Sequence, residues 1–139
     1  MSTPVQVTGL TGVIAIAAAN DVSYALQTDG AGGGIVWAWG KNNYGQLGDG
    51  STLSRSTPVR VSGLPGVTAI AASFDSQFAI ALASNGQVWA WGANDEGQLG
   101  NGTVPNGTTP AVVSTISTAR MIAAGSLYAL AIDRTARVG

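Results

Sequence analysis

Short apolar segments separated by turn residues are the dominant pattern along this chain. Four of them, five to seven residues long, are Val13–Ala19 (VIAIAAA), Val67–Ala72 (VTAIAA), Phe78–Ala83 (FAIALA) and Val88–Gly92 (VWAWG). Isolated helices of this length are marginal and turn residues flank the segments, so the pattern predicts β-strands. Because apolar residues occupy both faces of these strands, we expect sheets that are covered on both sides.

The residues between the apolar segments predict antiparallel connections. Ser84-Asn85-Gly86 separates two of the strands, and its Asn-Gly pair suits the positive φ angles of a hairpin turn. Trp89 and Trp91 then share one face of their strand, because side chains alternate along a strand. Pro58-Val59-Arg60-Val61 is a further extended segment, whose proline fits a strand start or an edge. Each unit is therefore predicted to contain four short antiparallel strands.

The unit occurs more than once. Residues 36–50 (VWAWGKNNYGQLGDG) and 88–102 (VWAWGANDEGQLGNG) agree at eleven of fifteen positions, and residues 3–18 recur as 57–72. A third, weaker copy starts at residue 109 and stops before a tryptophan segment. The predicted units of this single segment, residues 1–139, are 2–55, 56–108 and the incomplete 109–139. Repeated units of four antiparallel strands that cover one another predict an all-β fold of β-propeller blades.

The repeat resembles that of a known family. The run V-W-A-W-G-x-N-x-x-G-Q-L-G-x-G, spaced by just over fifty residues, is similar to the repeat of the regulator of chromosome condensation family, which includes α-tubulin suppressor-like proteins. The resemblance covers nearly the whole chain and implies β-propeller blades, in rings that typically have seven. The family's Gly-x-x-His motif is absent, because the chain has no histidine. The exchange-factor surface of the founding member does not map onto this sequence.

About two and a half units do not close a propeller, which needs roughly four to eight blades. Two interpretations remain open. The chain is part of a larger ring, or two or three copies close a ring through head-to-tail contacts. In either case the blades at the two ends leave apolar faces that recruit further protein.

Composition restricts the chemistry that the chain can perform. It has neither cysteine nor histidine, a net charge of −1, and only 9% charged residues. We therefore expect no metal site, no cofactor and no enzymatic activity. The six basic residues are scattered, so we expect no nucleic-acid partner, and no apolar run is long enough to cross a membrane. The N-terminus has no signal-peptide pattern, which makes the cytoplasm the default expectation, and the composition indicates a bacterial source.

Two groups of candidate residues follow from the comparison of the copies. Repeated residues are expected to form the blade core: Trp37, Trp39, Trp89, Trp91, Leu47, Leu99, Gly45 and Gly97. The alternative for the tryptophans is a surface that binds glycans or small ligands. Residues in loops before or after the repeated strands are candidates for partner binding: Asp21, Asn43, Tyr44, Phe74, Asp75, Asp95 and Glu96. Framework residues that are kept beside loop tips that vary are typical of a binding face on a scaffold.

Asp21 and Asp75 align between copies just before the second strand, and an Asx-turn is the alternative explanation for both. The function predicted from the sequence is a non-catalytic scaffold that binds a protein partner through loops on one face. The alternative is a self-assembling unit, natural or engineered, that closes a ring with copies of itself.

Overall fold

The computed structural model describes residues 6–28, 30, 33–73, 75, 77–93, 107–113, 119–124 and 129–133. These residues form ten β-strands and no helix, which confirms the predicted all-β fold. The first sheet consists of β1 (Val13–Ala19), β2 (Val22–Thr28), β3 (Gly34–Gly40) and β4 (Arg55–Arg60). The second consists of β5 (Val67–Ala72), β6 (Phe78–Ala83), β7 (Val88–Gly92) and β8 (Gly107–Val112), and β9 (Ala119–Ala124) pairs with β10 (Ala129–Asp133).

Each strand pairs antiparallel with the strand that follows it in its own sheet. β4 pairs with β3, so Arg55–Arg60 completes the first sheet and does not begin the second. A single pairing of Gly34 with Val67 joins the two sheets at one corner. A Cβ atom at Gly34 would lie 2.7 Å from the Val67 carbonyl oxygen, so only glycine permits this approach.

The turns within the sheets follow the predicted chemistry. At Ser84-Asn85-Gly86, Gly86 has φ +89° and its N–H donates to the Ala83 carbonyl at 3.0 Å. β1 and β2 are joined by two residues, Asn20 and Asp21, whereas five residues, 73–77, join β5 and β6. The extra length of the second unit therefore includes three residues in the turn between its first two strands.

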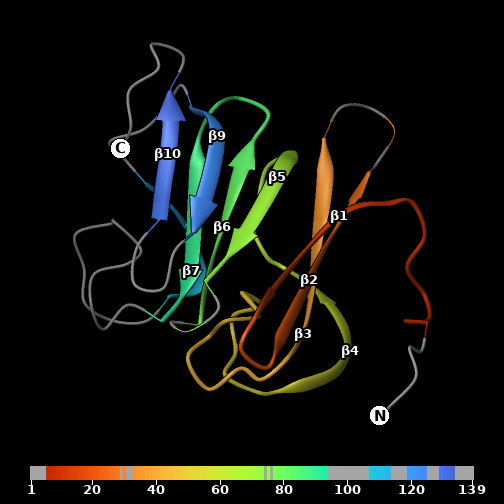
Figure 1. Cartoon of the computed structure of the whole chain (residues 1–139). Helices are drawn as coiled ribbons and strands as arrows, with labels where there is room; N and C mark the ends of the chain where they lie inside the picture. The colour runs from red at the N-terminus through yellow and green to blue at the C-terminus, as the bar shows by residue number, and fades with distance from the viewer. Residues whose placement is uncertain are drawn as a thin grey trace.

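The two sheets pack face to face, and β9 covers the far side of the second sheet (Figure 1). One buried cluster joins Tyr24, Leu26 and Val36 of the first sheet to Ala81 and Trp91 of the second. A second cluster places Phe78, Ile80, Leu82, Val88 and Ala90 against Ala119. All six residues of β6 are buried, as expected for a strand covered on both faces.

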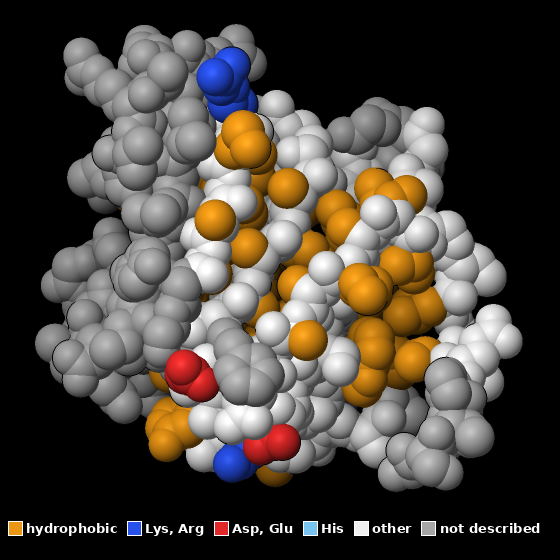
Figure 2. Space-filling view, in the orientation of Figure 1, with side chains coloured by type: hydrophobic (Ala, Val, Ile, Leu, Met, Phe, Trp, Pro, Cys, Tyr) orange, Lys and Arg blue, Asp and Glu red, His pale blue; other side chains and the backbone are white. Residues whose placement is uncertain are grey.

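Within the described residues, the first sheet is covered on one face only. Along β1 the alanines at positions 15, 17 and 19 face the second sheet, while Ile14 and Ile16 are exposed. Figure 2 shows hydrophobic side chains gathered on the part of the surface that the first sheet forms, at the right of the view. No other sheet of the described residues therefore packs against this face of the first sheet.

Candidate functional site

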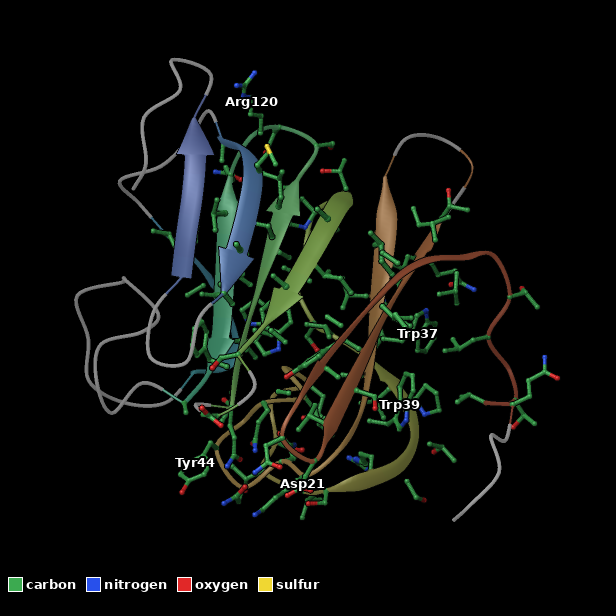
Figure 3. All side chains as sticks on the ribbon, viewed as in Figure 1. Asp21, Trp37, Trp39, Tyr44 and Arg120 are labelled. Carbon is green, nitrogen blue, oxygen red and sulfur yellow. The ribbon has the colours of Figure 1, made fainter. Side chains whose placement is uncertain are left out.

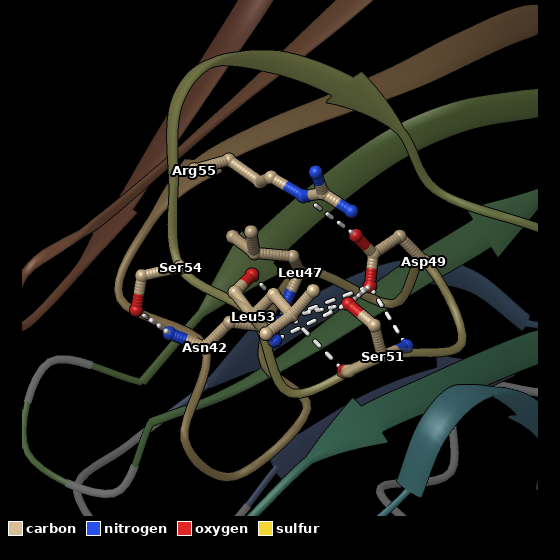
Figure 4. A network of polar contacts seen from close by, with 7 residues as sticks. All are labelled: Asn42, Leu47, Asp49, Ser51, Leu53, Ser54 and Arg55. Atoms are coloured by element: carbon tan, nitrogen blue, oxygen red, sulfur yellow. Dashed lines mark hydrogen bonds and ion pairs between the residues drawn. The ribbon is translucent and has the colours of Figure 1, made fainter.

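Residues 41–54, between β3 and β4, form a loop that a buried asparagine holds together. The side-chain nitrogen Nδ2 of Asn42 donates to the carbonyl oxygens of Ser51 and Leu53, both at 3.0 Å. Its side-chain oxygen Oδ1 accepts from the Leu47 N–H at 2.9 Å (Figure 4). Asn42 is fully buried. Its side chain therefore supplies the hydrogen bonds that a strand partner would supply in a sheet, and fixes the loop's shape.

Asp49 forms the charged end of the same network. Its Oδ1 accepts from the Ser51 N–H at 2.9 Å and from the Ser51 hydroxyl at 2.8 Å, and Arg55 Nε lies 3.6 Å from Oδ2. Burial disfavours the charged carboxylate, but the bonds from Ser51 and Asn42 and the Arg55 charge outweigh it. Together they hold the pKa of Asp49 below its usual value.

The pKa of Asp49 is lower in the folded chain than in the unfolded chain. Its ionisation therefore stabilises the fold above the pKa of an unfolded aspartate, about 3.9. This contribution is lost as the pH falls through the lower folded pKa. In urea titrations between pH 6 and pH 2, Asp49→Asn should therefore lose less stability on acidification than the wild type. Ser51→Ala, which removes one donor to the carboxylate, should lie between them. Identical pH profiles for all three chains would rule out this role for Asp49.

A backbone carbonyl in the loop joins the two sheets. The carbonyl oxygen of Gln46 accepts from the Tyr24 hydroxyl at 2.7 Å and from Trp91 Nε1 at 2.9 Å. Tyr24 lies on β2 and Trp91 on β7, and their rings meet edge to face with centroids 6.2 Å apart. Burial raises the pKa of Tyr24 far above its ordinary value, so its hydroxyl stays protonated and donates. We call Tyr24, Gln46 and Trp91 the junction triad.

Glycines on both sides of Gln46 let the loop backbone lie against the second sheet. A Cβ atom at Gly48, where φ is +65°, would lie 2.9 Å from Cδ1 of Trp91. A Cβ at Gly45, where φ is +79°, would lie 2.7 Å from the Cα of Thr108 in β8. Leu47, between them, is fully buried. The Gly-Gln-Leu-Gly sequence is therefore one part of the first unit that contacts the second.

The Gln46 side chain fixes the outer part of the loop. Its Oε1 accepts from the Tyr44 N–H at 2.7 Å, and its Nε2 donates to Asn43 Oδ1 at 3.2 Å and to Gln77 Oε1. Gln77 ends the turn that precedes β6 in the second sheet. The loop tip is thus held both to its own base and to the neighbouring sheet.

The structure brings several of the predicted partner-binding residues to one end of the sheets. Asn43 and Asp21 are exposed and Tyr44 is half-buried. Figure 3 shows Asp21 and Tyr44 at the same end, with Arg120 at the opposite end. Asp75 is exposed in the β5–β6 turn. The other partner-binding candidates, Phe74, Asp95 and Glu96, lie outside the described residues, as do the predicted core residues Gly97 and Leu99.

The expected equivalence of Asp21 and Asp75 is wrong. Asp21 has φ +62° and its carbonyl accepts from the N–H of Lys41. In the second sheet Gln77, not Asp75, has these properties, with φ +54° and a carbonyl that accepts from the N–H of Ala93. The longer β5–β6 turn places Asp75 two positions before the equivalent residue.

The four tryptophans differ in burial although they repeat in sequence. Trp91 is fully buried, whereas Trp37, Trp39 and Trp89 are half-buried. Trp37 Nε1 donates to Gln27 Oε1 at 3.0 Å, and Trp89 Nε1 is buried with no hydrogen-bond partner among the described residues. In Figure 3, Trp37 and Trp39 lie on the flank of the first sheet that faces away from the second.

Two residues of the site were missed in the sequence. Tyr24 has no repeated counterpart, because the same register position in the second sheet is Ile80. Asn42 does repeat, as Asn94, but it stands directly before the loop tip that varies between the copies. Its repetition was the signal that it belongs to the framework.

Two classes of site are absent from the described part of the chain. Those residues contain no group of three acidic, histidine or cysteine side chains that could hold a metal ion. Nor do they contain a helix with the length and apolar character that crossing a bilayer requires.

Comparisons with solved structures show the fold. The chain is similar to human WBSCR16, with a TM-score of 0.81 and 22% identity, over 96% of this chain and 34% of that one. It is also similar to yeast RCC1 (Prp20), from its complex with Kap60, with a TM-score of 0.76 and 21% identity, over 94% of this chain and 32% of that one. These chains are β-propellers, so the sheets described above are blades of a partial β-propeller.

Sequence comparisons show the family. Human E3 ubiquitin-protein ligase HERC2 is 36% identical over 92% of this chain, which spans 3% of that protein. Rat alsin is 40% identical over 68% of this chain, which spans 6% of that protein. Models of the regulator of chromosome condensation (RCC1) repeat match residues 33–82 and 85–132. The chain therefore belongs to the RCC1 repeat family.

Proposed function

We propose that the chain is a non-catalytic scaffold that binds a protein partner through the loops at the Asp21 and Tyr44 end of the blades. The observation that carries this proposal is the construction of the loop at residues 41–54. Buried Asn42 and Gln46 hold its backbone, while Asn43 is exposed at its tip and Tyr44 is half-buried. A loop that is ordered before binding loses little entropy when a partner docks, which favours affinity.

The chemistry of this end fits recognition of a protein surface. Tyrosine offers a large contact area at low entropic cost and is enriched in the contacts that dominate binding energy. Asp21, Lys41 and Asp75 are exposed charged residues in the same loop or in the β1–β2 and β5–β6 turns. Yeast Prp20p gives a precedent among similar structures, because it binds Gsp1p and histones. The proposal that the scaffold is non-catalytic is supported by the absence of histidine and cysteine from the sequence.

Site-specific photocrosslinking tests this proposal. A photoreactive phenylalanine analogue at position 44 should crosslink a protein in cells that express the chain, whereas the same analogue at position 120 should not. Asn43→Arg, which alters an exposed side chain beside the probe, should reduce the crosslinked product at least about fivefold. Because it also removes the hydrogen bond from Gln46 Nε2 to Asn43 Oδ1, it should lower the free energy of unfolding by no more than about 1.5 kcal/mol in urea titrations. Equal crosslinking from positions 44 and 120, or none from position 44, would exclude a partner at this end.

Purified Gsp1p and histones, which Prp20p binds, are defined protein probes for this proposal. Ring closure by two or three copies of the chain stays a separate prediction, which a solution mass by light scattering measures. The two proposals are independent, because the loops that carry Tyr44 lie at one end of the sheets and ring closure uses the sheet faces.

A further inference from the structure

The turn between β6 and β7 contains an asparagine followed by a glycine, Asn85 and Gly86. Asn85 is exposed, whereas Gly86 is buried. The turn arches over one end of the second sheet, beside the start of β9 (Figure 1). The other asparagines that the structure describes, at positions 20, 42 and 43, are not followed by glycine. Among the described asparagines, only Asn85 is therefore followed by a residue that has no Cβ atom to obstruct its amide nitrogen.

The folded turn holds the Asn85 side chain over the backbone that follows it. Asn85 Oδ1 accepts from the Gln87 N–H at 3.0 Å, and Asn85 Nδ2 donates to Gln87 Oε1 at 3.0 Å. The first of these bonds closes a ring that includes both Asn85 Cγ and Gly86 N, so it keeps the two atoms near each other. The Gln87 N–H also points at the oxygen that becomes negative when a nucleophile adds to Cγ. The turn therefore prepares Cγ for attack by Gly86 N.

The surroundings of Gly86 hold that nitrogen back. Its N–H donates to the Ala83 carbonyl at 3.0 Å, and its carbonyl accepts from the Ala119 N–H of β9 at 2.9 Å. Ala119 is itself buried against the second sheet. An amide that is buried and hydrogen-bonded keeps its proton until the structure around it opens. Attack on Cγ therefore requires the turn to separate from β9.

We propose that Asn85 is a deamidation site, and that the contact between Gly86 and Ala119 controls its reaction. When the turn opens, hydroxide removes the Gly86 amide proton and the nitrogen adds to Asn85 Cγ. Nδ2 takes a proton from water and leaves as ammonia, and a succinimide ring remains. Water then opens this ring at Cγ to give aspartate, or at the main-chain carbonyl to give isoaspartate. In total one water is consumed and one ammonia is released.

The isoaspartate product changes the contact that controls the reaction. The Ser84 N–H donates to the Gly66 carbonyl at 2.8 Å, and the Gly86 carbonyl accepts from Ala119, so the turn is held on both sides of residue 85. Isoaspartate places Cβ in the main chain between these two bonds. The Gly86 carbonyl must then shift relative to Ala119. We therefore expect conversion to isoaspartate to weaken the contact with β9 permanently, because the asparagine amide does not form again.

Peptide mapping by mass spectrometry tests the control by β9. The folded chain and the chain unfolded in urea are incubated at pH 8, and electron-transfer fragmentation distinguishes isoaspartate from aspartate at position 85. We expect conversion in both samples, at least about tenfold slower in the folded chain. Ala119→Pro removes the N–H that bonds to Gly86, at the first residue of a strand, where proline is tolerated. It should raise the rate in the folded chain at least about threefold, whereas the matched control Ala119→Ser keeps the N–H and should leave the rate unchanged.

A second readout uses the unmodified sequence, so it does not depend on the folding of a variant. The isoaspartate form is separated from the starting chain, and amide exchange of Ala119 is compared in the two by NMR. This exchange should be at least about tenfold faster in the isoaspartate form. Exchange of the Trp91 indole should stay the same, because Trp91 belongs to the cluster between the first and second sheets.

Four results would overturn the proposal. The first is a chain in urea that does not convert at position 85. The second is an equal rate in the folded and unfolded chains, because the fold would then give no control. The third is an equal rate in the Ala119→Pro and Ala119→Ser chains, because the contact with β9 would then not be the controlling one. The fourth is unchanged Ala119 exchange in the isoaspartate form.

Discussion

Replacing Trp91 with alanine is expected to lower the free energy of unfolding by about 3–5 kcal/mol, the usual cost of truncating a buried aromatic residue. The Trp91 side chain is fully buried between the sheets, and its indole donates to the Gln46 carbonyl. Its removal leaves a cavity at the contact between the blades. It also takes one donor from a buried carbonyl that then depends on Tyr24 alone.

Trp39→Ala is the matched comparison, because Trp39 occupies the same position in the repeated sequence. Its side chain is half-buried on the uncovered face, so we expect a loss of only roughly 1–2 kcal/mol. Urea unfolding followed by circular dichroism measures both values. Equal losses at the two positions would show that the first sheet is covered in solution, or that Trp91 is not part of the contact.

Gly92→Ala should lower the free energy of unfolding about as much as Trp91→Ala does, because backbone atoms leave no space for a Cβ atom at this position. Gly92 has φ +103°, and a Cβ atom there would lie 2.6 Å from the Gln77 carbonyl oxygen and 2.9 Å from the Cα of Phe78. Backbone strain costs about 1–3 kcal/mol and overpacking a further 1–3, so we expect a loss of about 2–6 kcal/mol. Both obstructing atoms belong to the backbone, which cannot move aside as a side chain can.

Gly63→Ala separates the two contributions. Gly63 has φ +74°, but a Cβ atom there would meet nothing within 4 Å. Its replacement should therefore cost only the strain of the left-handed conformation, about 1–2 kcal/mol. Thermal or urea unfolding of the two variants gives the comparison. A Gly92→Ala chain no less stable than the Gly63→Ala chain would mean that the backbone of β6 does not lie where the structure places it.

The strands could be predicted because their signals are local. β5, β6 and β7 begin and end at the residues that the apolar segments and the Asn-Gly turn indicated. Turn residues and alternation along a strand act over a few positions, so the sequence carries them directly. The repeat then predicted the propeller, because repeated units of four antiparallel strands that cover one another are typical of its blades.

The partners of the repeated residues could not be predicted in the same way. Trp39 and Trp91 have the same sequence context, but only Trp91 lies against another sheet. Tyr24, which shares the Gln46 carbonyl, is 22 residues away from it in the chain and has no repeated counterpart. Contacts of this kind depend on which sheet stands opposite, and no local pattern encodes that.

The central claim is that the Gln46 carbonyl ties the two blades together through Tyr24 and Trp91. Solvent exchange of the four indole N–H groups, measured on the unmodified chain by NMR, tests it most directly. The junction triad predicts that the Trp91 indole is the most protected of the four and that the Trp39 indole exchanges rapidly. A Trp91 indole that exchanges as fast as that of Trp39 would contradict the account.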